Sequence, residues 1–70
     1  MTEKEWRMIF ADRLKGLLER EGMSQADFAE HMEITDSAVS KYVHGRHTPK
    51  ISTLLRMCSV LDCELVDLIC

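Results

Sequence analysis

Apolar side chains recur along this chain three or four residues apart, the spacing of amphipathic helices, and no strand-like alternation persists beyond a few residues. Thr2 with Glu5, and Ser24 with Asp27, have the form of a capping box, in which a hydroxyl and a carboxylate satisfy free amides at a helix start. Thr35 stands just ahead of a further apolar run, where its hydroxyl suits an N-cap. The pattern predicts five helices, at about residues 3–21, 25–32, 36–43, 51–61 and 64–69.

Glycine and proline mark the boundaries of these segments. Gly22 and Gly45 each follow a predicted helix, and glycine adopts the left-handed backbone of a helix end without the steric cost of a side chain. Pro49 cannot continue a helix and restricts the residue before it, so residues 46–50 are predicted to form an exposed loop. Ile34 is expected to plug a tight turn between the second and third helices.

Each predicted helix has one apolar face. The side chains expected to point inward are Trp6, Phe10, Leu14, Leu17, Leu18, Phe28, Ala29, Met32, Ala38, Val39, Tyr42, Val43, Leu54, Leu55, Cys58, Leu61, Leu65, Leu68 and Ile69. Arg56 is expected to point outward. Trp6, near the start of the first helix, leaves two interpretations open: it extends the core, or it is an aromatic anchor at a subunit interface, where tryptophan is enriched.

The outer face of the helix predicted at 36–43 is small and polar. At about 100° per residue, Ser37, Lys41 and His44 lie roughly 140–200° from the inward-facing Val39, with Ser40 beside them. This stripe can donate and accept hydrogen bonds and carries a cation near its end. Such a face is either an ordinary solvated surface or a reader of a polar partner.

The order and spacing of these features resemble the phage-repressor and Cro-like helix-turn-helix family of DNA-binding domains, also called Xre-type regulators. The matching elements are Leu14-x-x-Leu17, Gly22-x-Ser24-Gln25, the helix pair from Ser24 to Gly45, Gly45-x-x-x-Pro49 and Leu54-Leu55-x-x-x-x-x-Leu61. The resemblance covers about residues 10 to 69. It implies that residues 1–70 form a single all-α domain, a compact five-helix bundle whose second and third helices make the DNA-reading unit.

Two departures from the family pattern bear on this resemblance. Glu33 occupies the turn position that the family most often fills with glycine. Either the backbone there is left-handed, at a cost of about 1 kcal/mol relative to glycine, or the turn is slightly reshaped. Leu18 and Val43 replace a buried arginine–glutamate pair found in many members. Because both partners change to apolar residues, no unpaired charge is buried, and the double change supports the alignment.

The resemblance also assigns DNA-contacting positions. It implies base contacts for Thr35, Asp36, Ser37 and Lys41 and a phosphate contact for Gln25. Further phosphate contacts are expected, from charge, hydrogen-bonding capacity and position, for Ser24, Ser40, His44, Arg46 and Lys50. Lys41 is the strongest candidate, since lysine donates to guanine O6 and N7 in the major groove. Asp36 either accepts from cytosine N4 or only favours the helix N-terminus electrostatically. His44 either touches the DNA backbone or has no role, and Arg46 and Lys50 alone could be ordinary solvated charges.

Charge is distributed unevenly along the 70 residues. The net charge is −3, with block charges of −3 over residues 1–34, +2 over 35–50 and −2 over 51–70. The only positive block is thus the proposed reading helix and the loop after it, with His31, His44 and His47 in or near it. A domain that is acidic elsewhere should bind nonspecific DNA weakly.

Other function classes find little support in the sequence. No apolar run approaches the roughly 18 residues that span a bilayer, and no signal-peptide pattern precedes the first helix, so a cytoplasmic protein without a membrane partner is expected. The three cysteines fit free thiols in a reducing compartment, and Cys58, Cys63 and Cys70 lack the paired spacing of zinc sites. Cys58 is expected to be a small core residue, and Cys63 occupies a position where the family often has a helix-capping serine. No catalytic constellation is visible, so neither enzyme activity nor a cofactor is expected.

These observations predict a sequence-specific regulator of transcription that binds double-stranded DNA, acting as a homodimeric repressor on a palindromic operator. The expected dimer surface consists of Trp6, Val60, Leu65, Val66 and Ile69. The chain ends at Cys70 without an effector domain, so no small-molecule ligand is expected to bind it, and control is expected through another protein. Two alternatives stay open: the antitoxin or accessory subunit of a toxin–antitoxin pair, and a protein-interaction module that uses the acidic surface and C-terminal helix.

Overall fold

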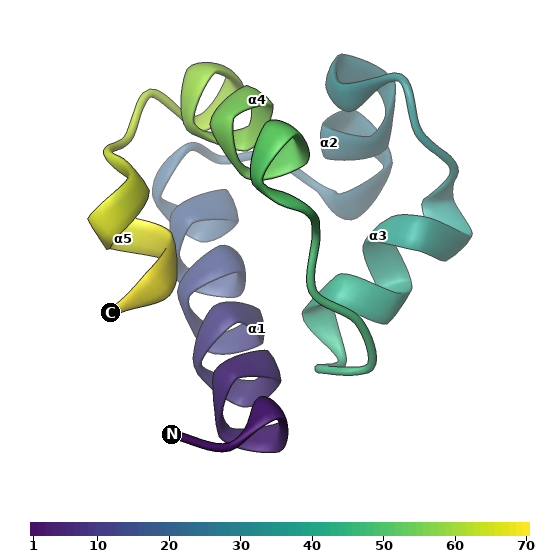
Figure 1. Cartoon of the computed structure of the whole chain (residues 1–70). Helices are drawn as coiled ribbons and strands as arrows, with labels where there is room; N and C mark the ends of the chain where they lie inside the picture. Colours follow the sequence, from purple (N-terminus) through teal and green to yellow (C-terminus); the bar gives the residue numbers. More distant parts are fainter.

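The computed structural model describes residues 1–70 and contains five helices and no strand (Figure 1). They are α1 (Glu3–Arg20), α2 (Gln25–Met32), α3 (Asp36–Val43), α4 (Ile51–Leu61) and α5 (Leu65–Ile69). The predicted all-α, five-helix architecture is confirmed. Two bounds differ by one residue, because α1 ends at Arg20 and α5 begins at Leu65. No helix is both long and apolar enough to cross a membrane.

The helix starts follow the capping residues predicted from the sequence. The Thr2 hydroxyl accepts from the Glu5 amide at 3.1 Å, and Glu5 Oε1 accepts from the Thr2 amide at 3.0 Å. Ser24 and Asp27 make the same reciprocal pair at 3.0 and 3.1 Å. At α3, Thr35 Oγ1 accepts from the Ala38 amide at 3.1 Å. Local side-chain chemistry therefore fixes where the first three helices begin.

The first four helices end in one common way. In each, a carbonyl near the helix end accepts from the amide five residues later, and the residue just before that amide has a left-handed backbone, the arrangement of a Schellman motif. The bonded carbonyl and amide residues are Leu18 and Met23 at 2.9 Å, Ala29 and Ile34 at 3.0 Å, Lys41 and Arg46 at 2.9 Å, and Cys58 and Cys63 at 3.0 Å. The left-handed residues have φ of +63° at Gly22, +58° at Glu33, +69° at Gly45 and +50° at Asp62. We call the four bonded residue pairs the helix-end pairs.

All five helices contribute side chains to one core. Figure 1 shows α3 and α5 on opposite sides of α1, with α4 across the top, and α1 contacts both of its neighbours. The core consists of Phe10, Leu14, Leu17, Leu18, Phe28, Ala29, Met32, Val39, Val43, Leu54, Met57, Leu61 and Leu68. Leu18 and Val43 are 5% and 3% exposed. The two positions that hold an ion pair in many relatives are therefore apolar and buried in one cluster.

Three details differ from the expectations, two in burial and one in a helix cap. Leu55 is 56% exposed, whereas Met57 is fully buried, because the inward stripe of α4 runs through Leu54, Met57 and Leu61. Pro49 is buried although its loop is otherwise largely exposed.

Glu64, not Cys63, is the N-cap residue of α5. The Glu64 amide donates to Asp67 Oδ2 at 2.8 Å, so the acidic side chain one turn into the helix satisfies a free amide. Cys63 belongs instead to the end of α4, where its amide bonds the Cys58 carbonyl.

Candidate nucleic-acid interface

The turn between α2 and α3 keeps the family geometry although it lacks glycine. Glu33 has φ +58° and ψ +42°, the left-handed conformation, and its side chain is exposed. Ile34 is half-buried against the core, as expected of the apolar plug. The turn is therefore not reshaped to accommodate Glu33, and the chain accepts the backbone strain at this residue.

Arg56 of α4 supports this turn, a role that the sequence did not suggest. Its guanidinium donates to the carbonyl of Met32, the last residue of α2, and lies 4.0 Å from a Glu33 carboxylate oxygen. Arg56 side-chain exposure of 52% agrees with the predicted outward direction. A cation bound to a free carbonyl at a helix C-terminus is stabilising, so Arg56 anchors α2 to α4.

The outer face of α3 is open to solvent. Thr35, Asp36, Ser37 and Lys41 are all exposed, while Val39 and Val43 on the opposite side are buried. A surface hollow of about 200 Å³ lies on this face. Its lining residues are Thr35, Ser37, Ala38, Lys41, Tyr42 and His47. Three of the four predicted base-contacting residues thus share one concave surface, whereas Asp36 does not line it.

His47 is the residue of this surface that sequence reasoning missed. It is exposed in the loop after α3 and lines the hollow beside Lys41. Its place in the positively charged block was the only available signal, because the path of a loop after a helix is not fixed by helical periodicity.

Two cationic residues occupy the end of α3. Lys41 and Arg46 form the third helix-end pair, with the Arg46 amide bonded to the Lys41 carbonyl at 2.9 Å. Both residues are exposed, whereas in α1 and α2 the same positions hold apolar residues. Neither Lys41 nor Arg46 is in an ion pair; the three pairs in the structure involve Arg7, Arg20 and Arg56. Their free charges suit an anionic partner.

Residues of α1 hold the loop that carries Arg46. Arg7 Nε donates to the Gly45 carbonyl at 3.2 Å, and its guanidinium also lies 3.3 Å from Glu3. A Cβ atom on Gly45 would stand 2.7 Å from the sulfur of Met8, and Gly45 has φ +69°. The backbone angle favours glycine, and the Arg7 bond fastens the path from Lys41 to Arg46 to α1.

The remaining predicted phosphate contacts divide into two groups. His44 Nδ1 lies 2.7 Å from the Ser40 carbonyl and 3.3 Å from its hydroxyl, so these two side chains already interact with one turn of α3. Ser24, Gln25 and Lys50 are exposed at helix starts, the first two at α2 and the third as the N-cap residue of α4.

Ser24 also holds Asp27 in its charged form. The Ser24 amide, and secondly its hydroxyl, lower the pKa of the Asp27 carboxyl below its ordinary value by hydrogen bonding. The negative charge lies in the first turn of α2, where its interaction with the helix dipole is favourable.

The predicted dimer residues are mostly part of the protein body. Trp6, Val60, Leu65 and Ile69 are half-buried against the core, and only Val66 is exposed, at 54%. The Trp6 ring centroid lies 5.6 Å from that of Phe10, which lies 6.0 Å from Tyr42 in an edge-on arrangement. Trp6 therefore extends the core toward α3.

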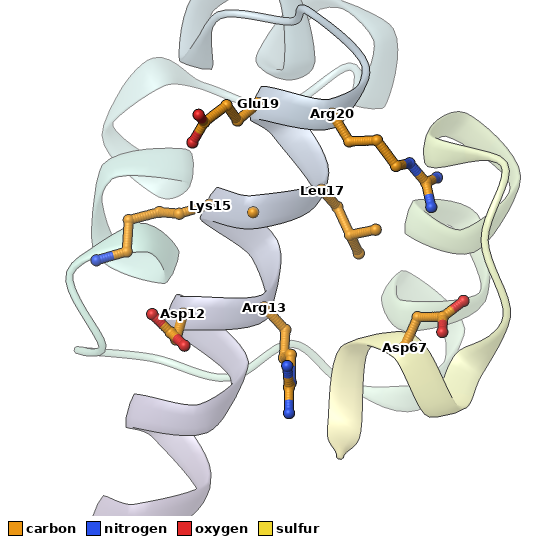
Figure 2. Close-up of a pocket in the computed structure, with 8 residues that line it drawn as sticks. Asp12, Arg13, Lys15, Leu17, Glu19, Arg20 and Asp67 are labelled. Atoms are coloured by element: carbon orange, nitrogen blue, oxygen red, sulfur yellow. The ribbon is translucent and has the colours of Figure 1, made fainter.

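A larger hollow, of about 500 Å³, lies between α1 and α5 (Figure 2). Its lining residues are Asp12, Arg13, Lys15, Gly16, Leu17, Glu19, Arg20 and Asp67. The three cations in this lining are matched by three carboxylates. The hollow therefore has no net attraction for a polyphosphate, unlike the face of α3. No cluster of three or more His, Cys, Asp or Glu side chains is placed to hold a metal ion.

Five short helices with an open, polar α3 and a cationic helix end define a helix-turn-helix DNA-binding domain. The chain belongs to the helix-turn-helix family HTH_3, whose sequence pattern matches residues 14–68. The predicted membership of the Xre- and Cro-like group is thereby confirmed. None of the curated proteins compared with the chain matches it significantly.

Solved structures share the fold over nearly the whole chain. An HTH_3 family transcriptional regulator from Vibrio cholerae superposes with a TM-score of 0.87 at 22% identity, covering 96% of this chain and 38% of that one. This chain thus spans well under half of the Vibrio protein. The hypothetical transcription factor NHTF from Neisseria has a TM-score of 0.88 at 20% identity, covering 100% and 80%. The restriction-modification controller protein C.AhdI from Aeromonas hydrophila has a TM-score of 0.82 at 26% identity, covering 89% and 94%.

Proposed function

We propose that this protein is a sequence-specific regulator of transcription that acts as a homodimeric repressor on a palindromic operator. The observation that carries the proposal is the exposed polar face of α3, with Ser37 and Lys41 free to enter a major groove. The likeness to the controller protein C.AhdI, matched over 94% of its length, supports a regulatory role. One short reading helix covers few base pairs, and a second half-site one helical turn away multiplies affinity.

The contacts separate into reading and positioning groups. Thr35, Ser37 and Lys41 surround the hollow on α3 and are assigned to base edges, with Lys41 donating to guanine. Arg46, beside Lys41 at the helix end, is assigned to a phosphate, since a guanidinium matches phosphate oxygens in a bidentate way. Gln25, at the start of α2, is assigned to a second phosphate, where free amides and the helix dipole suit an anion.

Two alanine variants test this division. Lys41→Ala is expected to relax base preference by about 1–3 kcal/mol at one position, whereas Arg46→Ala should weaken binding to every sequence and reduce the salt slope by about one. Lys15→Ala, which removes an exposed lysine on α1, is the matched control and should leave binding unchanged. Duplexes for the titrations come from a selection of bound fragments out of random DNA.

The same measurements can overturn the proposal. If Lys41→Ala and Arg46→Ala behave like Lys15→Ala on every duplex, the protein-interaction module is the better account. Selected fragments without an inverted repeat would contradict the palindromic operator. A toxic protein that co-purifies in fixed ratio with this chain, and whose toxicity this chain suppresses, would favour the antitoxin alternative over the homodimeric repressor.

A further inference from the structure

Two cysteines occupy the helix-end pair of α4. The Cys63 amide donates to the Cys58 carbonyl at 3.0 Å, and Asp62 between them is left-handed, with φ +50°. Both cysteines are half-buried and pack against the core, whereas Cys70 is exposed. In this motif the side chains of the bonded residues converge, a contact usually made by apolar groups.

The other helix ends show what this position does. Leu18 with Met23 and Ala29 with Ile34 fill the same two positions in α1 and α2, and all four side chains are buried or half-buried. The fourth pair therefore replaces an apolar contact by two thiols. The two thiols also interact electrostatically. Burial, and then the charge and hydrogen bonding of the Cys58 thiol, raise the pKa of Cys63 to about 11.

The α4–α5 turn that carries the cysteines is held from outside. Arg20 of α1 donates to the carbonyls of Leu61 and Asp62 at 2.9 and 3.3 Å. These bonds fix the backbone of the turn on α1. The backbone of the turn is therefore held in place while the two thiols, which are near enough to hydrogen bond, lie on either side of Asp62.

We propose that Cys58 and Cys63 form a redox modification site that closes to an intramolecular disulfide by reaction with low-molecular-weight disulfides such as oxidised glutathione. The thiolate of one cysteine attacks the glutathione disulfide, forms a mixed disulfide and releases one glutathione thiolate. The second cysteine, as its thiolate, then attacks the protein sulfur of the mixed disulfide and releases the second glutathione. The two protein thiols are oxidised, two glutathione molecules are produced, and the two thiol protons pass to the released thiolates or to water.

Either thiolate can begin the sequence, because a mixed disulfide formed at one cysteine is opened by the thiolate of the other.

The test uses the full chain with Cys70→Ser, which removes the exposed third thiol. The reduced protein is incubated with excess oxidised glutathione at neutral pH, quenched with acid, alkylated and weighed by mass spectrometry. We expect a monomer that has lost two hydrogen atoms, carries no glutathione, takes up no alkylating agent and recovers both thiols with dithiothreitol. Glutathione adducts or disulfide-linked dimers as the main product would overturn the proposal.

The matched control moves one thiol around α4. Cys58→Ser combined with Ser59→Cys in the same background keeps two thiols but places one about 100° away, on an exposed position. This variant should accumulate glutathione adducts, and closure as complete as in the unmoved pair would contradict the role of the helix end. Circular dichroism checks that it folds.

A second measurement does not depend on that variant folding. The closure equilibrium of the Cys70→Ser protein, measured in glutathione buffers, should be several-fold more favourable in water than in denaturing urea, because the fold holds the thiols together. By linkage, the disulfide should then raise the urea midpoint. An equal or lower closure constant in the folded protein would refute the assignment.

Discussion

Glu33→Gly should make the protein more stable, although the change lies in the turn of the DNA-reading unit. Glu33 holds a left-handed backbone, with φ +58°, which costs about 1–2 kcal/mol for a residue with a Cβ atom. Glycine removes this strain but loses about 0.4–1 kcal/mol through the greater freedom of the unfolded chain. The Arg56–Glu33 contact, at 4.0 Å with the glutamate 87% exposed, contributes little. The net gain should be about 0.5–1 kcal/mol.

Urea unfolding with a shared m-value measures this gain, and thermal unfolding should show a rise of about 4 °C, since about 4–8 °C correspond to each kcal/mol in a domain of this size. Glu33→Gln is the matched control: it removes the charge but keeps the strained backbone, so its stability should stay within about 0.3 kcal/mol of the parent. A Glu33→Gly protein that is no more stable, or a Glu33→Gln protein that gains as much, would refute the assignment of strain to the backbone.

Three further changes test the supports of α2 and α3. Gly22→Ala and Gly45→Ala should each destabilise the protein by about 1 kcal/mol, because both positions are left-handed and the exposed Met8 side chain can move away from a new Cβ at Gly45. Unchanged urea midpoints would show that these helix ends tolerate a side chain. Arg56→Met keeps the apolar stem but loses the hydrogen bond to the end of α2, so the free energy of unfolding in urea should fall by about 1 kcal/mol. An unchanged free energy of unfolding would show that Arg56 does not support the turn. Asp27→Asn should have a lower free energy of unfolding than the parent above the ordinary aspartate pKa of 3.8. This difference in stability should disappear as the pH falls through the lower pKa that Asp27 has in the folded protein. A difference that does not change with pH in urea titrations would contradict the capping role.

Much of the architecture could be predicted because its determinants are local. The hydroxyls of Thr2, Ser24 and Thr35 accept from amides three residues later, so the starts of α1, α2 and α3 are encoded in short stretches of sequence. The left-handed backbone at Gly45 follows from the one residue type that adopts it freely. At Glu33 the sequence left two outcomes open, a left-handed residue or a reshaped turn, and the structure has the left-handed residue.

The missed features depend on contacts between distant segments or on helix rotation. Arg56 meets the Met32 carbonyl 24 residues away, and its place on α4 gives no local sign of that partner. Leu54 and Leu55 are both apolar, and only the packing of α4 decides that Leu54 is 5% and Leu55 56% exposed. The position of His47 beside Lys41 likewise depends on the loop path that Gly45 takes over α1.

The charge pattern would orient the protein on DNA as well as attract it, with the α3 face toward the phosphates. The face of α3 and its loop carry +2, whereas the rest of the chain sums to −5. Acidic surfaces on the other helices are repelled by phosphates, so an encounter with DNA favours the approach of α3. In the proposed complex a short cationic footprint would release few counterions, so we expect weak nonspecific binding and a larger share of the affinity from base contacts.

The repeated helix end explains how one backbone device serves three purposes in this protein. The bonding pattern and the left-handed residue are the same in four helices, so the outcome depends on the two side chains that the motif brings together. Apolar pairs in α1 and α2 close the core, and the Lys41–Arg46 pair concentrates charge on an exposed surface. The Cys58–Cys63 pair is neither fully buried nor charged, and a hydrogen bond joins the two thiols. The same backbone geometry therefore carries an apolar contact, a charged surface or a pair of thiols, depending only on the two residues that occupy it.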